Sequence, residues 1–379
     1  MMLPVAIVGG GPVGLALALL LQQSDVDCEV IDARPAGAVG DDRRVLALSH
    51  GTRQTLERLG AWAAIGATPI TTIHVSQQGH LGRTLIRAED AGVPALGYVA
   101  EAGRVGAALA QACAVAGVKT RHETKVTGTE AGAHSVLLHC VGQAGASDLD
   151  AQLVAWAEGA VAAESAGVRR DYGQQAIVAG VQTREPQSGT AYERFTPTGP
   201  VALLPLADRH ALVWTVPDAA AADLLALDDS AFLSRLQDVF SGRLDFVALA
   251  ARTAFPLGLR YRAAPVAERA VWVGNAAQTL HPVAGQGFNL ALRDVSQLAR
   301  VLRDSRTDCG HAALLARHAA ARRLDRQSTI GFTDGLVRLF GIEMAAAGHA
   351  RGAGLLALDL LPGARRFLAR RMIFGARGW

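Results

Sequence analysis

The glycine cluster at residues 9–14 constrains the fold more than any other part of the chain. An apolar run at residues 5–8 leads directly into Gly9, Gly11 and Gly14, spaced G-x-G-x-x-G, and a helical pattern follows. Between a strand and a helix, the first glycine allows a tight turn, the second lets the backbone approach a pyrophosphate, and the third permits close packing of helix on strand. The helix start adds free N–H groups for phosphate oxygens. The pattern predicts a dinucleotide-binding βαβ unit of an α/β fold.

A second apolar run, at residues 28–31, ends at Asp32. A carboxylate at this position typically hydrogen-bonds a ribose hydroxyl. The loop that follows contains Ala33 and Arg34, and an arginine there can hold a diphosphate through charge-assisted hydrogen bonds. A glycine-rich turn without a ligand is the simpler alternative, but strand, helix and acid in their expected order favour a bound dinucleotide. The acid does not distinguish NAD from FAD, because both contain an adenosine ribose.

Composition excludes several classes of protein. The 379 residues are enough for roughly two domains, and half of them are hydrophobic. A net charge of +3 without clustered Lys and Arg argues against a nucleic-acid partner. The four cysteines are dispersed with no C-x-x-C pair. This spacing argues against a disulfide framework or a metal site and indicates a reducing compartment.

The N-terminus has no basic segment ahead of its apolar residues, and no window reaches ~18 uninterrupted apolar residues. We therefore expect neither a signal peptide nor a transmembrane helix. The expected location is the cytoplasm.

A later stretch raises a separate question. An apolar run ends in Asn275, a loop follows, and Gly-Gln-Gly-Phe-Asn at residues 285–289 then opens a helix predicted over 287–303. Glycines at the start of a helix leave bare main chain, which suggests that a large flat group lies against it.

These motifs, with a basic segment at residues 42–52, resemble the group A flavoprotein aromatic hydroxylases. Within them, the chain resembles the ubiquinone-biosynthesis hydroxylase family, most of all its hydroxylases of 2-polyprenyl-6-methoxyphenol. The resemblance runs almost from end to end, and further matching segments lie at residues 70–76, 193–196, 199–205 and 358–362.

The resemblance implies a fold like that of p-hydroxybenzoate hydroxylase. It predicts a discontinuous, Rossmann-like FAD-binding domain at residues 1–70, 97–160 and 265–320. A substrate domain with a mixed β-sheet is expected at residues 71–96 and 161–264, where short alternating strands are predicted around 193–195, 201–206 and 211–216. A C-terminal helical region is expected at 321–379.

The same resemblance places FAD. Asn275 is expected to hydrogen-bond the ribityl chain, and residues 285–289 are expected to lie under the isoalloxazine ring. Arg104 opens a helix predicted at 105–116, where it either contacts a flavin phosphate or is simply solvated. Motif and resemblance together predict FAD contacts from Gly9, Gly11, Pro12, Val13, Gly14, Asp32, Ala33, Arg34, Arg44, Arg104, Val126, Glu158, Asn275, Gly285, Gly287, Phe288 and Asn289.

The implied reaction is hydroxylation of a polyprenylated phenol by O₂. FAD reduced by NAD(P)H would form a C4a-hydroperoxide, whose distal oxygen goes to the ring. His281 and Pro282 are predicted to face the flavin as catalytic residues. His281 could relay a proton, or it could shape the loop by bonding a backbone carbonyl, and both alternatives stay open.

One segment departs from the family pattern. Glu158 stands where relatives have Asp, the His-Ser that follows it there is missing, and no second G-x-G-x-x-G exists for NAD(P)H. This leaves two alternatives to a hydroxylase: a flavin-dependent reductase or dehydrogenase of the same fold, or a catalytically weakened flavin-binding member of a quinone-biosynthesis complex.

The tail at residues 365–374 is basic and amphipathic. It could lie on an anionic membrane surface, which would make the protein peripheral to the inner membrane, or it could pack as a helix on the flavin domain. Further copies of the same chain are also possible partners, in a homo-oligomer.

Overall fold

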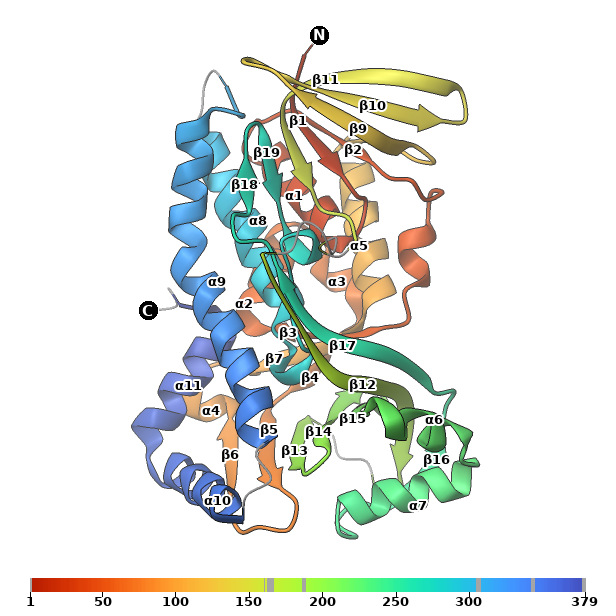
Figure 1. Ribbon diagram of the computed structural model, residues 1–379, viewed down its shortest axis with the longest axis vertical. Helices are drawn as coiled ribbons and strands as arrows, with labels where there is room; N and C mark the ends of the chain where they lie inside the picture. The colour runs from red at the N-terminus through yellow and green to blue at the C-terminus, as the bar shows by residue number, and fades with distance from the viewer. Residues whose placement is uncertain are drawn as a thin grey trace.

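The computed structural model describes residues 2–159, 161, 167–185, 189–304, 308–341 and 345–376. Figure 1 shows two halves, each built on a large sheet. The half with the N-terminus occupies one end of the molecule and the second sheet the other, and helix α9 (Ala312–Phe340) runs alongside both.

The first sheet has the order β18-β19-β11-β1-β2-β8, with β10 paired to β11 and β9 to β10. Its strands are β1 (Leu3–Val8), β2 (Cys28–Ile31), β8 (Lys119–Arg121), β9 (Lys125–Ala131), β10 (Val136–Gly142), β11 (Gly145–Trp156), β18 (Val266–Ala267) and β19 (Ala270–Trp272). The five strands from β19 to β8 run parallel, so their carboxyl ends meet at one edge.

Both faces of this sheet are covered, which explains the unbroken apolar run in β1. Val5 and Ile7 pack into the core beneath α1 (Pro12–Gln22), α5 (Ala102–Val115) and α8 (Gly287–Arg303). Ala6 and Val8 point the other way, into a smaller core that β10 helps to build. The strand and helix predictions around the first glycine cluster are confirmed, as is the helix at 287–303; α5 begins at Ala102, three residues earlier than predicted.

The second sheet is mixed and has the order β20-β17-β12-β15-β14-β13-β5-β6, with β16 paired to β12. Its strands are β5 (Thr72–Gln77), β6 (Arg83–Arg87), β12 (Val168–Thr183), β13 (Thr190–Thr196), β14 (Gly199–Leu206), β15 (Arg209–Pro217), β16 (Phe246–Leu249), β17 (Thr253–Tyr261) and β20 (Gln278–Thr279). The long strands β12 and β17 reach from the second sheet toward the first half (Figure 1). The three strands predicted between residues 193 and 216 are confirmed.

Alternation along β14 gives the two faces of this sheet different surroundings. Val201 and Leu203 point into a core with α6 (Asp218–Ala226) and α7 (Asp229–Val239). Ala202 and Leu204 point to the opposite face, which borders a cavity. One face of the sheet therefore packs in a hydrophobic core, and the other is available to a ligand.

Smaller elements complete the fold. They are the sheet β3-β7-β4, of β3 (Val45–Ser49), β7 (Gly97–Glu101) and β4 (Thr68–Ile70), the helices α2 (His50–Arg58), α3 (Trp62–Ile65), α4 (Ala88–Ala91), α10 (Ala345–Leu360) and α11 (Pro362–Phe374), and the 3-10 helices η1 (Ala38–Asp41), η3 (Gly274–Ala276) and η4 (Val283–Gly285). Within the predicted C-terminal helical region, α10 ends at Leu360 and α11 begins at Pro362. The fold class predicted from the sequence is confirmed. The domain bounds stay a prediction, and β20 crosses them by pairing with β17.

Candidate functional site

Four chain segments meet at the carboxyl edge of the first sheet. Val8 pairs with both Ile31 and Trp156, and Trp156 pairs with Trp272, so the residues that follow these strands share one edge. Since β2 lies on one side of β1 and β11 on the other, the chain reverses direction across the sheet at β1. Ligands of open α/β sheets bind in the crevice at such a switch point.

The glycine turn after β1 lies at this crevice. Gly9 has a φ of +111°, and a Cβ there would lie 2.8 Å from the backbone nitrogen of Glu158. A Cβ on Gly14 would lie 2.0 Å from the carbonyl oxygen of Gly9, so both glycines are required by packing within the turn. A Cβ on Gly11, by contrast, would have no neighbour within 4 Å. Gly11 therefore borders the crevice, where a pyrophosphate could approach the backbone.

The start of α1 is shaped for the same purpose. Pro12 occupies its first turn, and no side chain caps its N–H groups. Val13 packs against η3: a Cβ built on Gly274 would lie 3.2 Å from the Cγ1 of Val13. The uncapped helix start and the loop after β19 are thus held together, and the free N–H groups could bind phosphate oxygens.

Asp32 is buried at the end of β2 and has Arg34 as its partner. Arg34 donates from Nε to Oδ1 at 3.1 Å and from Nη2 to Oδ2 at 2.8 Å, and its backbone N–H reaches Oδ1 at 3.0 Å. Burial opposes ionisation of Asp32, but these hydrogen bonds outweigh it and lower the pKa of the carboxyl. Asp32 is therefore ionised, and its carboxylate could accept a hydrogen bond from a ribose hydroxyl in addition to those from Arg34. Ala33, between them, is exposed.

Glu158 and Val126 flank this position. The pKa of Glu158 is raised, because its carboxyl is partly desolvated and faces the Asp32 charge. Val126 on β9 packs against the small core that contains Val8 and Ile31. The segment that replaces the family pattern after Glu158 lies largely at residue 160 and residues 162–166, outside the described residues.

Arg44 and Arg104, both predicted to contact FAD, have different neighbours. Arg44 is exposed and pairs with Asp42, with Nη2 at 2.6 Å from Oδ2. Arg104 is exposed in the first turn of α5, where its guanidinium lies against Gly66. Neither is brought into the glycine turn by a contact among the described residues, so the FAD contact of Arg44 and the flavin-phosphate contact of Arg104 stay predictions.

Gly285 and Gly287, the two glycines predicted to lie under a flat ring, have different surroundings at the start of α8. Gly285 has a φ of +58°, and a Cβ there would come within 2.8 Å of the Cβ of Ala47 on β3. Packing against the protein therefore requires this glycine. A Cβ on Gly287 would have no neighbour within 4 Å, and Gln286 gives α8 no side-chain cap. Gly287 and the first N–H groups of α8 are thus the parts of this segment that a ligand could reach.

Asn289 has a structural role that its sequence motif does not reveal. Its Nδ2 donates to the carbonyl oxygens of Ala47 and Gly285, both at 2.9 Å. Its Oδ1 accepts from the Ser49 N–H at 2.8 Å and from the Thr52 hydroxyl at 2.7 Å. The buried side chain thus ties α8, β3 and α2 together.

Asn275 is exposed in η3, and its side chain has no hydrogen bond among the described residues. Unlike Asn289, it could give its whole amide to a ligand. Phe288 packs against the main core and is only partly buried.

His281 is buried, with 2 % of its surface exposed. Its Nδ1 accepts from the Val283 N–H at 3.1 Å, and its ring packs edge-on against Tyr172. Burial lowers the pKa of His281 to about 4, so the ring is neutral near pH 7. The contact supports the loop-shaping alternative, although the partner is an N–H rather than a carbonyl. Pro282 is exposed and lines the cavity described next.

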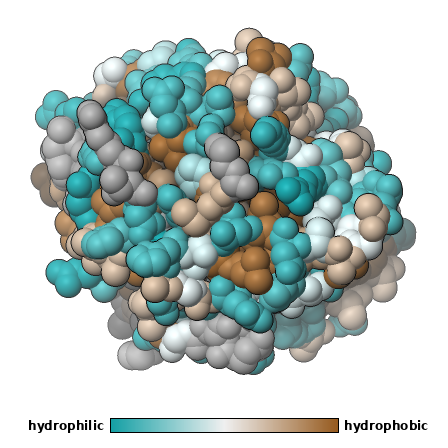
Figure 2. Space-filling model, turned by 90° about the horizontal axis from the view of Figure 1, so that it is seen from above, coloured by the Kyte–Doolittle hydropathy of each residue, from teal (hydrophilic) through white to brown (hydrophobic). Residues whose placement is uncertain are grey.

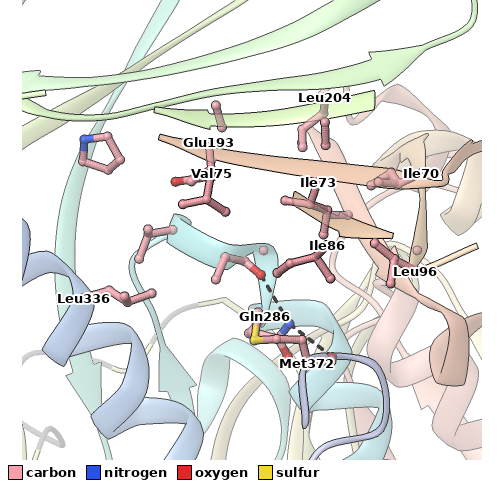
Figure 3. A pocket seen from close by; sticks show the side chains of 18 of the residues that line it. Ile70, Ile73, Val75, Ile86, Leu96, Glu193, Leu204, Gln286, Leu336 and Met372 are labelled. Carbon is pink, nitrogen blue, oxygen red and sulfur yellow. Dashed lines mark hydrogen bonds between the residues drawn. The ribbon is translucent and has the colours of Figure 1, made fainter. Parts of the chain in front are cut away.

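A cavity of about 300 Å³ lies between the second sheet and the loop before α8. Figure 3 shows Ile73, Val75 and Leu204 on the sheet side, facing Leu336 and Met372 on the helix side. The wall is completed by β3, β6 and α10 and is almost entirely apolar. A hydrophobic substrate next to a flat cofactor is what such a space suits.

Glu193 is the cavity residue that the motif reading did not assign to the site. It lies on β13, and its side chain enters a wall that is mostly apolar (Figure 3). Burial alone raises the pKa of Glu193 to about 7. The signal in the sequence is a carboxyl at a position that strand alternation places on the same face as Ala191 and Phe195.

The arrangement fits FAD. The features that a dinucleotide with a terminal flat ring could contact are the open backbone at Gly11 and Gly287, the uncapped starts of α1 and α8, and the Asn275 amide, which has no partner among the described residues. Among the described residues, no group of three or more His, Cys, Asp or Glu could hold a metal ion. None of the helices in the described part of the chain is long and apolar enough to span a bilayer.

Known proteins share both sequence and fold with this chain. The family model for an FAD binding domain matches residues 2–333. The ubiquinone hydroxylase UbiL of Rhodospirillum rubrum is 34% identical over 393 residues, which cover 97% of this chain and 88% of that protein. The 3-demethoxyubiquinol 3-hydroxylase of Escherichia coli is 34% identical over 321 residues, 80% of each chain. The crystal structure of p-nitrophenol 4-monooxygenase PnpA from Pseudomonas putida DLL-E4 superposes with a TM-score of 0.80, at 18% identity and 99% coverage of both chains.

Proposed function

Because the chain belongs to the FAD-binding family of group A flavin monooxygenases, we propose that it hydroxylates a polyprenylated phenol in ubiquinone biosynthesis, of the 2-polyprenyl-6-methoxyphenol type. It is an FAD-dependent enzyme that uses NAD(P)H. The observation that carries the substrate class is the apolar cavity, which adjoins the loop before α8 on one side and α10 and α11 on the other. A ring could lie beside the loop while its prenyl chain extends between the helices.

The residues at the sheet edge are proposed to hold FAD. Asp32 would accept a hydrogen bond from a ribose hydroxyl, and Gly11 with the start of α1 would bind the diphosphate. Asn275 would form a hydrogen bond with the ribityl chain. When bound, FAD accepts electrons from NAD(P)H and activates O₂, which side chains cannot do. The first N–H groups of α8 would stabilise negative charge at the ring edge that they face.

His281 is proposed to shape this loop rather than to relay a proton. The Val283 N–H occupies its Nδ1, and the ring stays neutral because burial lowers the pKa of His281 to about 4. The loop would then present Pro282 and the start of α8 to the ring and to the substrate.

A membrane surface is the proposed source of the substrate, which would make the protein peripheral to the inner membrane. Leu355 and Leu358 of α10 line the cavity, while Leu356 and Leu360 on the same helix are exposed. Such an arrangement would let a prenyl chain pass from lipid into the cavity. Membership of a quinone-biosynthesis complex and a homo-oligomeric state stay predictions.

The test is an oxygen-transfer assay on the purified FAD-loaded protein. NADH and NADPH oxidation would be followed with and without a phenol that carries a short prenyl chain, under ¹⁸O₂. We expect stimulated NAD(P)H oxidation and a product that carries one labelled oxygen, with weaker stimulation by the same phenol without its chain. Oxidation without label in the product would instead favour the reductase alternative, and FAD binding without any oxidation would favour a flavin-binding member of a complex.

A further inference from the structure

Among the described residues that line the cavity, Glu193 is the only one with a carboxyl, and its position is set by β13, the strand that carries it. Along β13, Ala191, Glu193 and Phe195 line the cavity. Arg194, the next residue in the chain, points to the opposite face, where its Nε donates to the Val239 carbonyl at 2.5 Å and its Nη1 to the Ser76 hydroxyl at 3.1 Å. The nearest arginine in the sequence is therefore committed elsewhere and does not neutralise Glu193.

The strands on either side of β13 offer Glu193 no partner either. Its neighbours across the ladder are Val75 on β5 and Ala202 on β14, neither of which has a polar side chain. Within the described residues, no hydrogen bond reaches its carboxyl, and none of the lining residues is Lys, Arg or His. The adjacent titratable groups are His74 and Tyr192, whose rings contact one another; Tyr192 also borders the cavity, but its ring packs on Phe240 in the core on the other face of the sheet.

A carboxyl in such a place is unfavourable for the free protein. Moving a charged group out of water without a compensating partner destabilises the folded state, and nearly all buried polar groups in proteins are hydrogen-bonded. A carboxyl that lines a cleft without a partner is a candidate for contact with a ligand. The apolar surroundings also strengthen any hydrogen bond that a ligand donates.

We propose that Glu193 binds the substrate by accepting a hydrogen bond from the ring hydroxyl of a phenol in the cavity. This inference rests on the proposed function, because it names the contact by which that phenol would be recognised. A phenol hydroxyl is a strong donor, and the carboxyl accepts on two oxygens. An aryl ether has no hydrogen to donate, so the same ring with a methylated hydroxyl binds less tightly.

The same contact sets the orientation of the ring. The hydroxyl would lie at the sheet side of the cavity, beneath β13, while Gln286 and Pro282 lie across from it on the loop side. Aromatic acids are disfavoured when Glu193 is ionised, because their carboxylate would face it and none of the described lining residues is a cation that could offset the repulsion.

The test compares a phenol that carries a short prenyl chain with its methyl ether. Dissociation constants of both are measured by the change in flavin absorbance on the FAD-loaded wild type, on Glu193→Leu and on Glu193→Gln. The matched control is Glu268→Gln, whose carboxyl is exposed between β18 and β19 and has no hydrogen bond among the described residues. We expect the wild type and the control to prefer the phenol by roughly 10- to 100-fold.

Glu193→Leu is expected to bind the two compounds equally, and Glu193→Gln, whose amide oxygen still accepts, to keep part of the preference. Intact FAD absorbance and unchanged affinity for the ether in Glu193→Leu would show that the cavity is preserved. A Glu193→Leu variant with the wild-type preference overturns the inference, as does a wild type that binds phenol and ether equally. A wild type that binds neither compound while it holds FAD overturns the proposed function as well.

Discussion

At the scale of single residues, Glu193 links the free energy of unfolding to pH. Its folded pKa of about 7 exceeds the ordinary value of 4.5. The folded state therefore holds the Glu193 proton more tightly than the unfolded chain does. Its contribution to stability is fully present below about pH 4.5 and is lost as the pH rises through 7.

The variant Glu193→Gln should remove this dependence. Its free energy of unfolding, measured in urea without substrate, is expected to be close to that of the wild type at pH 5 and to exceed it at pH 8 by up to about 3 kcal/mol. Glu268→Gln serves as the control, because an exposed carboxyl should give a difference from wild type that changes little with pH. Equal pH dependence of the wild type and Glu193→Gln would contradict the assignment.

At the scale of secondary-structure elements, Asn289 holds the loop before α8 against β3 and α2. Asn289→Ala would remove the hydrogen bonds to two carbonyl oxygens, to the Ser49 N–H and to the Thr52 hydroxyl, which keeps only its weaker contact with the Ser49 hydroxyl. Because unsatisfied buried groups cost about 1–3 kcal/mol each and neighbouring effects do not add, we expect a loss of roughly 2–4 kcal/mol in the free energy of unfolding. Denaturation in urea would measure it, and FAD affinity should fall as well.

The matched control for Asn289 is Asn275→Ala. Its side chain is exposed and makes no hydrogen bond among the described residues, so its removal should change the free energy of unfolding by less than about 0.5 kcal/mol. We expect it to weaken FAD binding nonetheless. If Asn275→Ala left FAD affinity unchanged, or if Asn289→Ala left stability unchanged, the division between a ligand contact and a structural contact would be wrong.

The same elements show how far the sequence could lead. The glycine turn, the Asp32 strand end and the α8 start are local patterns, and each was predictable because its residues are neighbours in the chain. Asn289 was predicted from its motif as a cofactor contact, yet its four partners include residues about 240 positions away. Gly285 was predicted to leave room for a flat ring, but its missing side chain also avoids a clash with Ala47.

Glu193 shows the corresponding limit for the cavity. Its strand was predictable from alternation, and so was the face that it shares with Ala191. What that face borders depends on where α9, α10 and α11 pack, which no local pattern around residue 193 encodes. The local motifs of the site were therefore predictable from the sequence, whereas the cavity wall was not, because it depends on long-range packing rather than on local propensity.

At the scale of the whole molecule, exposed apolar side chains occur at both ends. Seen from the end of the first sheet, hydrophobic residues form patches divided by hydrophilic ones (Figure 2). The helices at the other end carry large apolar side chains that are more than half exposed. These are Leu356 at 51%, Leu360 at 68%, Leu361 at 57% and Phe367 at 55%. Arg366 and Arg370 of α11 are exposed beside them, a combination that suits an anionic bilayer surface.

The double variant Leu360→Asp/Phe367→Asp should therefore lose membrane association. Flotation with vesicles of phosphatidylcholine and phosphatidylglycerol would measure it, and we expect the bound fraction to fall several-fold, because each substitution removes apolar area and adds a repelled charge. The control is Val115→Asp, since Val115 is 86% exposed at the end of α5 and carries the same change on a distant surface. High salt should weaken binding of the wild type through its arginines. A double variant that floats as well as the Val115 control would mean that α10 and α11 only close the cavity and do not contact lipid.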